Sequence, residues 1–265
     1  MICLVDSFYS KDRISERRQI MRLKDKIALV IGGTSGIGEA TAKAYAKEGA
    51  KVGVSGRDEK DGNRIVEEIK EAGGEALFLK LDVTQFSEVK DVLDTLIETY
   101  GTLDILYNGA GIHDEYQNAL ELDEETYDQV MAVNLKGPYL AVKAALPTFL
   151  EKGKGTIINV GSQGSFVAGP GGSAYVTSKH ALEGFTKQLA FDFGEKGIKA
   201  NLLAPGYVET PMTEGSEEER LKDIPAKRAA KPEEIAKLAV FLASDESDYM
   251  HGSSVLMDGG WNIGR

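Results

Sequence analysis

The chain has 265 residues, 42% of them hydrophobic, and its 42 acidic and 31 basic side chains give a net charge of −11. So acidic a surface repels nucleic acid and anionic lipid, which disfavours both as partners. No apolar run approaches the roughly 18 residues that cross a bilayer, and the single cysteine, Cys3, forms no internal disulfide. We expect a cytoplasmic protein.

The first residues differ in composition from the rest of the chain. Basic side chains occur there without apolar periodicity, at Lys11, Arg13, Arg17 and Arg18. We therefore expect residues 1–22 to form an N-terminal extension that is disordered or foreign to the native protein. Residues 23–265 are expected to form one domain.

Short apolar runs alternate with amphipathic stretches from Lys26 onward. Strands are predicted at Ile27–Ile31, Lys51–Ser55, Ala76–Lys80, Ile105–Tyr107, Thr156–Val160, Lys199–Leu203 and Ser254–Met257. Helices are predicted from the turn after the first strand to about Glu48, and at Asp61–Ala72, Ser87–Tyr100, Thr126–Leu150, Tyr175–Lys196 and Pro232–Ala243. This alternation, with unbroken apolar strands, indicates an α/β fold. We expect a single Rossmann-type domain with a doubly wound parallel β-sheet and helices on both faces.

A glycine-rich turn lies between the first predicted strand and the helix that follows it. Glycines there let the backbone turn tightly and approach a pyrophosphate, and the helix N-terminus offers free N–H groups. The spacing Gly-x3-Gly-x-Gly departs from the commoner dinucleotide fingerprint. Alone, the turn therefore also fits a tight connection or the cofactor turn of a methyltransferase. The residues predicted to bind a dinucleotide here are Gly32, Thr34, Ser35, Gly36, Ile37 and Gly38.

The second predicted strand ends at Ser55, and Gly56 and Arg57 follow it. An acidic residue at this point would bind the adenosine ribose hydroxyls and favour NAD, whereas the fork of Arg57 can pair with a 2′-phosphate. The sequence therefore favours NADP(H) and leaves NAD(H) open. The alternative is an exposed loop arginine that Asp58 and Glu59 neutralise.

Tyr175 and Lys179 are four residues apart at the start of a predicted helix, so their side chains lie on one face. A nearby ammonium stabilises a phenolate and lowers the pKa of a tyrosine from its usual value of about 10. Such a tyrosine suits general acid/base catalysis. By itself, the same spacing also fits a surface tyrosine packed over a lysine.

Two further polar residues accompany this pair. Ser162 directly follows the fifth predicted strand, and ligands of parallel sheets bind at the carboxyl ends of the strands. The glycine-rich stretch Gly164–Gly172 lets the chain return toward Tyr175. Asn134 lies within a predicted long helix, where its amide is expected to hold a water against Lys179 or, alternatively, only to bend the helix.

Taken in this order, the motifs make the chain similar to the short-chain dehydrogenase/reductase family over about Leu23–Trp261, including the C-terminal signature Asp258-Gly259-Gly260-Trp261. The resemblance implies a catalytic tetrad of Asn134, Ser162, Tyr175 and Lys179. It implies further cofactor contacts at Asp82, Val83, Asn108, Ala110, Gly111, Pro205, Gly206, Val208 and Thr210, with Tyr175 and Lys179 also touching the cofactor. The residues Ile31, Gly109 and Gly161 depart from the family pattern and concern local rigidity rather than catalysis.

The resemblance also implies a reaction, the exchange of a hydride between a nicotinamide and a carbonyl carbon. Tyr175 is expected to act as acid/base while Ser162 fixes the substrate oxygen. Lys179 is expected to lower the pKa of Tyr175 and to bind the nicotinamide ribose, and Asn134 to support a relay water. No metal is expected. A complete tetrad argues against a methyltransferase and against a non-enzymatic dinucleotide sensor on the same fold.

The expected substrate is a small secondary alcohol or ketone, such as a hydroxysteroid, a sugar or a small carbonyl compound. The alternative is a 3-oxoacyl thioester on an acyl carrier protein. That alternative ranks lower, because Phe191 stands where such reductases usually carry arginine. The substrate pocket is predicted from His113, Gln163, Phe166 and Tyr207, with a lid at Thr213–Pro225 that carries Glu214, Glu217, Glu218 and Glu219. A homotetramer, or a homodimer, paired through the long helices is the expected assembly.

Overall fold

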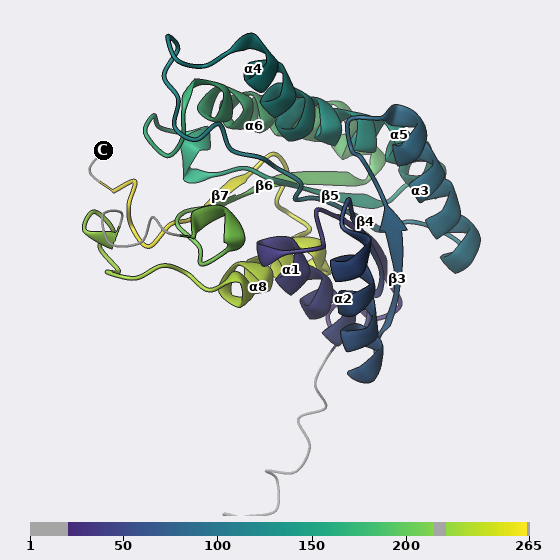
Figure 1. Cartoon of the computed structure of the whole chain (residues 1–265). Helices are drawn as coiled ribbons and strands as arrows, with labels where there is room; N and C mark the ends of the chain where they lie inside the picture. The colour runs from purple at the N-terminus through teal and green to yellow at the C-terminus, as the bar shows by residue number, and fades with distance from the viewer. Residues whose placement is uncertain (1–20, 215–220, 264–265) are drawn as a thin grey trace, which may run out of the picture.

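A computed structural model of the chain describes residues 21–214 and 221–263. Residues 1–20 of the predicted extension lie outside these ranges, as do the lid residues Glu217, Glu218 and Glu219. At the centre is one seven-stranded sheet in the order β3-β2-β1-β4-β5-β6-β7 (Figure 1). All neighbouring strands are parallel. The order reverses between β1 and β4, which confirms the predicted doubly wound α/β domain.

The strands are the seven apolar runs that the sequence predicts, with small shifts at their ends. Their bounds are β1 (Ile27–Ile31), β2 (Lys51–Gly56), β3 (Glu75–Lys80), β4 (Ile105–Asn108), β5 (Gly155–Val160), β6 (Ile198–Pro205) and β7 (Ser254–Met257). Strands β1, β4, β5 and β6 are buried along their whole length. These central strands carry no polar alternation because helices cover both of their faces.

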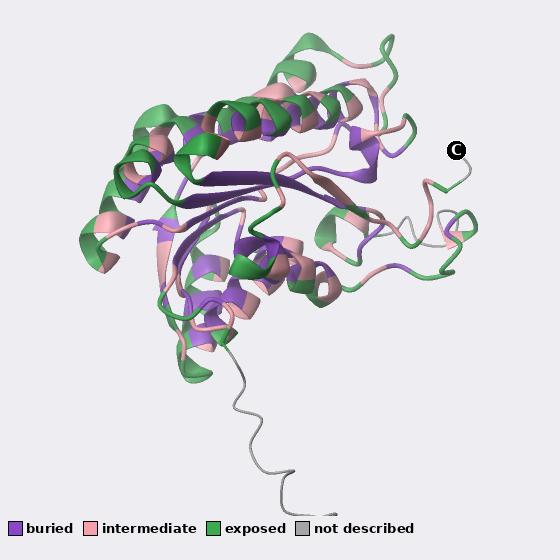
Figure 2. Ribbon diagram, turned by 180° about the vertical axis from the view of Figure 1, so that it is seen from behind, coloured by how far each residue is buried: buried purple, intermediate pink, exposed green. Residues whose placement is uncertain are grey.

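Two layers of helices enclose the sheet (Figures 1 and 2). One layer holds α1 (Gly36–Lys47), α2 (Glu59–Glu71) and α8 (Pro232–Ala243). The other holds α3 (Phe86–Tyr100), α4 (Glu124–Met131), α5 (Gly137–Lys152) and α6 (Ser173–Phe193). Each layer packs a separate apolar cluster against its face of the sheet. The carboxyl ends of the strands, where parallel sheets bind their ligands, therefore lie between the two helix layers.

The predicted helix Thr126–Leu150 is wrong as a single helix. Between α4 and α5, Ala132–Lys136 form a π-helical turn (η1), and the N–H of Gly137 bonds to a carbonyl five residues back. Pro138 supplies the physical reason. It has no N–H for the carbonyl four residues back, which is that of Asn134, and its ring would collide with that carbonyl in a regular α-helix.

The remaining differences are local. The helix predicted from Tyr175 begins slightly earlier and ends in a 3-10 turn, η3 (Gly194–Lys196). Three more 3-10 turns are not predicted, η2 (Gln163–Ser165), η4 (Pro211–Thr213) and η5 (Asp245–Ser247). In the part of the chain that the structure describes, no helix is long and apolar enough to cross a membrane.

Candidate active site

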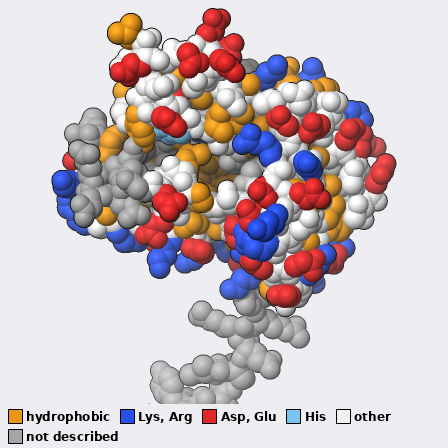
Figure 3. Space-filling model, in the orientation of Figure 1, with side chains coloured by type: hydrophobic (Ala, Val, Ile, Leu, Met, Phe, Trp, Pro, Cys, Tyr) orange, Lys and Arg blue, Asp and Glu red, His pale blue; other side chains and the backbone are white. Residues whose placement is uncertain are grey.

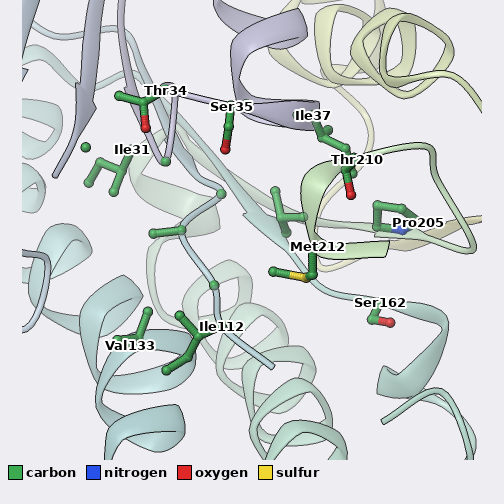
Figure 4. Close-up of a pocket in the computed structure, with 18 of the residues that line it drawn as sticks. Ile31, Thr34, Ser35, Ile37, Ile112, Val133, Ser162, Pro205, Thr210 and Met212 are labelled. Atoms are coloured by element: carbon green, nitrogen blue, oxygen red, sulfur yellow. The ribbon is translucent and has the colours of Figure 1, made fainter. Parts of the chain in front are cut away.

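A cleft opens at the carboxyl ends of the central strands, between the two helix layers. Figure 3 shows it as a hollow with hydrophobic side chains in and around it and acidic side chains farther out. Figure 4 shows Thr34, Ser35 and Ile37 on one side of it and Ile112 and Val133 on the other. Of the predicted site residues, the cleft is lined by Gly32, Thr34, Ser35, Gly36, Ile37, Gly38, Arg57, Asp82, Val83, Ala110, Gly111, Ser162, Tyr175, Lys179, Pro205, Gly206, Val208 and Thr210.

The glycine turn is packed so closely that side chains cannot be added to it. Gly32 has φ +77°, and a Cβ there would lie 2.5 Å from the backbone nitrogen of Ala110. A Cβ on Gly38 would lie 1.9 Å from the carbonyl oxygen of Gly32. The turn is tied to the segment after β4 by the N–H of Gly109, which donates to the carbonyl of Ile31 at 2.9 Å. The backbone amides at the start of α1 are thus presented directly to the cleft, as a pyrophosphate requires.

Arg57 and Asp82 line the cleft near the glycine turn, since a Cβ on Gly56 would lie 2.8 Å from the Thr34 side chain. Arg57 is exposed and, among the described residues, forms no ion pair. Asp58 does not neutralise it but caps α2, accepting the N–H of Asp61 at 2.9 Å. Asp82 accepts both the N–H and the hydroxyl of Thr84, at 3.0 and 2.8 Å. The Arg57 guanidinium is therefore left for an anionic ligand, while Asp82 shapes the turn beneath it.

The three predicted catalytic side chains that line the cleft are buried. Tyr175 and Lys179 lie on α6, and the Lys179 Nζ is 5.6 Å from the centre of the Tyr175 ring. The Lys179 ammonium donates to the carbonyl of Val160 at 2.8 Å. Burial lowers the pKa of Lys179 to about 8. Ser162 follows β5, and its Oγ accepts the N–H of Gly164 at 3.0 Å, which leaves the hydroxyl proton for another acceptor.

Asn134 is fully buried in the π turn, behind the cleft rather than on its wall. Its Oδ1 accepts the N–H of Ile112 at 2.8 Å, and its Nδ2 donates to the Ile112 carbonyl at 2.9 Å and to Ser178 Oγ at 3.2 Å. Both amide N–H groups are thus committed to the protein, and the side chain clamps the backbone beside the cleft. At most one lone pair of Oδ1 is left for the predicted water. The backbone carbonyl of Asn134 is a second acceptor, without its α-helical donor because Pro138 has no N–H.

Asn108, predicted to contact the cofactor, is not in the lining of the cleft. It lies buried at the end of β4, and its Nδ2 donates to Asn159 Oδ1 at 2.8 Å. Asn159 in turn donates to Thr186 Oγ1 at 2.9 Å. The Asn108 side chain therefore connects neighbouring strands beneath the cleft and does not line it.

The residues predicted to form the substrate pocket lie outside the lining of this cleft. Phe166 packs against the buried cluster of Leu182, Leu202 and Ala204. Tyr207 packs against Ile224 and Ala229, and its hydroxyl donates to the carbonyl of Thr213 at 3.1 Å. Gln163 is buried in the η2 turn. None of these three lines the cleft, and neither does His113, although its ring stacks on Tyr175 with the centroids 4.6 Å apart.

Several cleft residues were not predicted. They are mostly apolar or backbone-lining positions, among them Ile112, Val133, Val160, Pro211 and Met212 (Figure 4). A usable signal is present for some of them. Ile112 directly follows the predicted cofactor segment after β4, and Pro211 and Met212 directly follow Thr210. Thr213, the first residue of the predicted lid, also lines the cleft. Val133 carries no such signal in the sequence, because it reaches the cleft from the π turn.

The sequence has close relatives of known type. A family model described as enoyl-(acyl carrier protein) reductase matches residues 32–262. The chain is 37% identical over 248 residues to the 2,5-dichloro-2,5-cyclohexadiene-1,4-diol dehydrogenase LinX of Sphingobium indicum, which covers 92% of this chain and 98% of that relative. It is also 37% identical over 246 residues to the 3-oxoacyl-(acyl-carrier-protein) reductase FabG of Thermotoga maritima, over 91% and 99% of the two chains.

Solved structures agree with these relatives. A short-chain type dehydrogenase/reductase from Mycobacterium marinum matches with a TM-score of 0.89 and 34% identity, over 92% of this chain and 98% of that one. A dehydrogenase from Beutenbergia cavernae, solved with NADP bound at low occupancy, matches with a TM-score of 0.86 and 36% identity, over 91% and 98%. The likeness thus extends over nearly the whole of each protein.

Proposed function

Because the chain belongs to the short-chain dehydrogenase/reductase family and is an oxidoreductase acting on CH–OH groups, we propose that it exchanges a hydride between NADP(H) and a secondary alcohol or ketone. The observation that carries the proposal is the shared cleft. Tyr175, Lys179 and Ser162 line the same cavity as the glycine turn and Arg57. A dinucleotide held on the glycine turn therefore reaches the acid/base group within one site.

The reaction follows from what each side chain can do. The nicotinamide, when bound, supplies the hydride in reduction and accepts it in oxidation. Ser162 donates its free hydroxyl proton to the substrate oxygen, and Tyr175 delivers a proton to the same oxygen in reduction. The Lys179 ammonium, next to the Tyr175 ring, stabilises the phenolate that remains. A relay water is proposed beside Asn134, whose backbone carbonyl lacks an α-helical donor at Pro138.

Arg57 supports NADP(H) as the preferred cofactor, and NAD(H) is the alternative. Replacing Arg57 by alanine should raise the KM for NADPH about 10-fold or more, because a charge-assisted contact to the 2′-phosphate is lost. The KM for NADH should change little. Steady-state kinetics with both cofactors measure the ratio. Lys60→Ala, which removes another cation at the start of α2, is the matched control and should leave the ratio unchanged. A wild-type preference for NADH would contradict the assignment of Arg57.

The substrate class is tested by oxidation of NAD(P)H with a panel of carbonyl compounds. The panel comprises a cyclic ketone, a 3-oxosteroid, a keto sugar, a small open-chain ketone and a 3-oxoacyl thioester of pantetheine. We expect the highest kcat/KM with one of the first four. LinX, a dehydrogenase of a cyclic diol, supports this choice, and so does the exposed, uncharged Phe191 on α6. A preference for the thioester would favour the function of the relative FabG, and no turnover at all would leave a dinucleotide-binding protein without this activity.

We also propose a homotetramer, built in part on the face of α5 and α6, in the cytoplasm to which the single cysteine is suited. Tyr139 and Phe185, from these two helices, line a shallow apolar groove with Met131 and Leu135. Leu150 adds another exposed apolar side chain to α5. Pairing two such faces about a twofold axis would cover this surface. Sedimentation should show a tetramer, and a monomer at micromolar concentration would contradict the proposal.

A further inference from the structure

The loop that follows β4 contains a carboxylate that is almost completely buried. Asp114 is 1% exposed, and its two oxygens accept three backbone N–H groups. Oδ1 accepts the N–H of Gly172 at 2.8 Å, and Oδ2 accepts those of Ala174 and Tyr175, both at 2.9 Å. These N–H groups belong to the first turn of α6 and its N-cap, where no helical carbonyl is available to them. A carboxylate at this end is also favoured by the helix dipole.

The same loop makes a second set of contacts with α6. The N–H of Ser173 donates to the carbonyl of Gln117 at 3.0 Å, and the N–H of Gln117 donates to the carbonyl of Asp114 at 3.1 Å. A Cβ on Gly172 would lie 2.4 Å from the Gln117 carbonyl oxygen, so the two segments are in direct contact. Four consecutive backbone N–H groups, from Gly172 to Tyr175, are thus bonded by one short loop. We call residues 114–117 the Asp114 clasp.

The clasp holds an unfavourable backbone conformation. Glu115 and Tyr116 are adjacent non-glycine residues with φ of 49° and 63°. Left-handed residues of this kind are sparsely populated and persist where the surroundings over-determine them. The two left-handed residues turn the chain so that the Tyr116 ring stacks on His113, with the centroids 4.3 Å apart. The His113 ring in turn stacks on Tyr175 at 4.6 Å.

Tyr175 is therefore held at two points: the Asp114 clasp binds its backbone N–H, and the neighbouring His113 packs against its ring. On the other side, the backbone of Ile112 is clamped by both polar atoms of the Asn134 amide. His113 thus lies between a residue fixed by Asn134 and a residue fixed by α6. Neither His113 nor Asp114 lines the cleft, so neither takes part in the proposed chemistry directly.

We infer that Asp114 is a positioning residue for the proposed reaction: through its bonds to α6 and the His113 ring stacked on Tyr175, it fixes the orientation of the Tyr175 phenol toward the substrate oxygen. This inference rests on the proposed function of Tyr175. A phenol held in one orientation meets the substrate oxygen at the distance that proton transfer requires. The site thereby holds its acid/base group in place before substrate arrives, and the strain at Glu115 and Tyr116 is the local cost of that order.

The test is a graded series at Asp114 in the full-length protein. Asp114→Asn keeps one acceptor oxygen, and Asp114→Ala keeps none. We expect kcat to fall about 10-fold in the first variant and about 100-fold in the second. The Kd of NADPH, measured by fluorescence titration, should stay within about twofold, because the glycine turn and Arg57 are untouched. The primary deuterium isotope effect on kcat with C4-deuterated NADPH should rise, since a misplaced phenol slows the chemical step.

Two further variants separate positioning from folding. Asp123→Asn is the matched control, because Asp123 caps α4 through the N–H of Thr126 at 2.7 Å and has no contact with Tyr175. Its kcat and isotope effect should equal those of the wild type. His113→Ala removes the stacked ring but keeps the carboxylate, so it tests the same orientation if the Asp114→Ala protein does not fold. It should also lower kcat with the Kd of NADPH retained.

The inference is overturned if Asp114→Asn and His113→Ala both keep kcat within threefold of the wild type. It is also overturned if kcat and the melting temperature fall while the Kd of NADPH rises, with no change in the isotope effect. Failure of the proposed function looks different, because the wild type itself would then turn over no member of the panel. In that case hydrogen exchange still tests the clasp. The amides of Gly172 to Tyr175 should lose protection in Asp114→Ala and not in Asp123→Asn, and unchanged protection would refute it.

Discussion

Replacing Tyr175 by phenylalanine should lower kcat by roughly 10³-fold or more while the Kd of NADPH stays nearly unchanged. The substitution removes one oxygen atom and keeps the ring that packs against Gly171 and His113. The glycine turn and Arg57 are unaltered, so the cofactor keeps its contacts. Without the phenol, the proposed acid that transfers a proton to the substrate oxygen is lost, and Ser162 can only hydrogen-bond that oxygen. Stopped-flow hydride transfer and a separate cofactor titration measure the two effects.

Tyr249→Phe is the matched control for this change. Tyr249 is fully exposed, so loss of its hydroxyl should alter neither turnover nor cofactor affinity. If Tyr175→Phe kept more than a tenth of the wild-type kcat, another proton donor would have to be sought. If it lost cofactor binding as well, the role of Tyr175 would be structural and not chemical.

Replacing Lys179 by methionine should abolish most turnover and, at neutral pH, make the folded protein more stable. Turnover should fall at least about 100-fold, because the ammonium beside the Tyr175 ring no longer stabilises the phenolate. The gain in stability has a different cause. Burial lowers the pKa of Lys179 to about 8, so folding at pH 7 removes a charge from water at a cost. Methionine has a similar length and carries no such cost.

The pH dependence of this gain has a definite sign. The folded-state pKa of Lys179 lies below the unfolded value of about 10.5, so the unfolded chain binds more protons between about pH 8 and pH 10.5. Wild-type stability should therefore gain a contribution from this group as pH rises through that window. Below pH 8 the cost of the buried charge is fully present. The advantage of Lys179→Met, on the order of 1–3 kcal/mol at pH 7, should shrink toward pH 10.

Urea unfolding at pH 7 and pH 9.5 measures the difference. The lost hydrogen bond from Lys179 to the Val160 carbonyl reduces the gain, by about 1 kcal/mol. Lys187→Met, at an exposed position on the same helix, is the control and should show no such pH-dependent advantage. A Lys179→Met protein that is less stable than the wild type at pH 7 would mean that the ammonium stabilises the fold.

The predictable parts of the molecule were those that depend on neighbours in sequence. The strands were found because burial on both faces makes them continuous apolar runs. A few neighbouring residues suffice to predict each main feature of the site. These features are the glycine turn, the pair Tyr175 and Lys179, and Ser162 at the end of a strand. Rules about strand ends then placed them in one cleft.

The parts that were missed depend on contacts across the chain. Phe166 and Tyr207 stand close in sequence to cleft residues, yet their rings turn into separate apolar clusters. Asp114 is a loop aspartate in the sequence, and only the approach of α6, about sixty residues later, gives it partners. Pro138 was visible within the predicted long helix, and it should have signalled the break at Asn134.

The π turn at Ala132–Lys136 also determines how α5 is rotated about the helix axis relative to α4. Each α-helical residue advances the side chains by about 100°, so one extra residue per turn rotates everything downstream by that angle relative to α4. Because of this rotation, α4 packs against α6, while α5, the next helix along the chain, packs against α3. Deleting one residue from the turn would therefore act as a twist more than a shortening. The Asn134 side chain would then point away from Ile112 and lose its two hydrogen bonds to that backbone. The number of residues in this turn therefore matters as much as which residues they are.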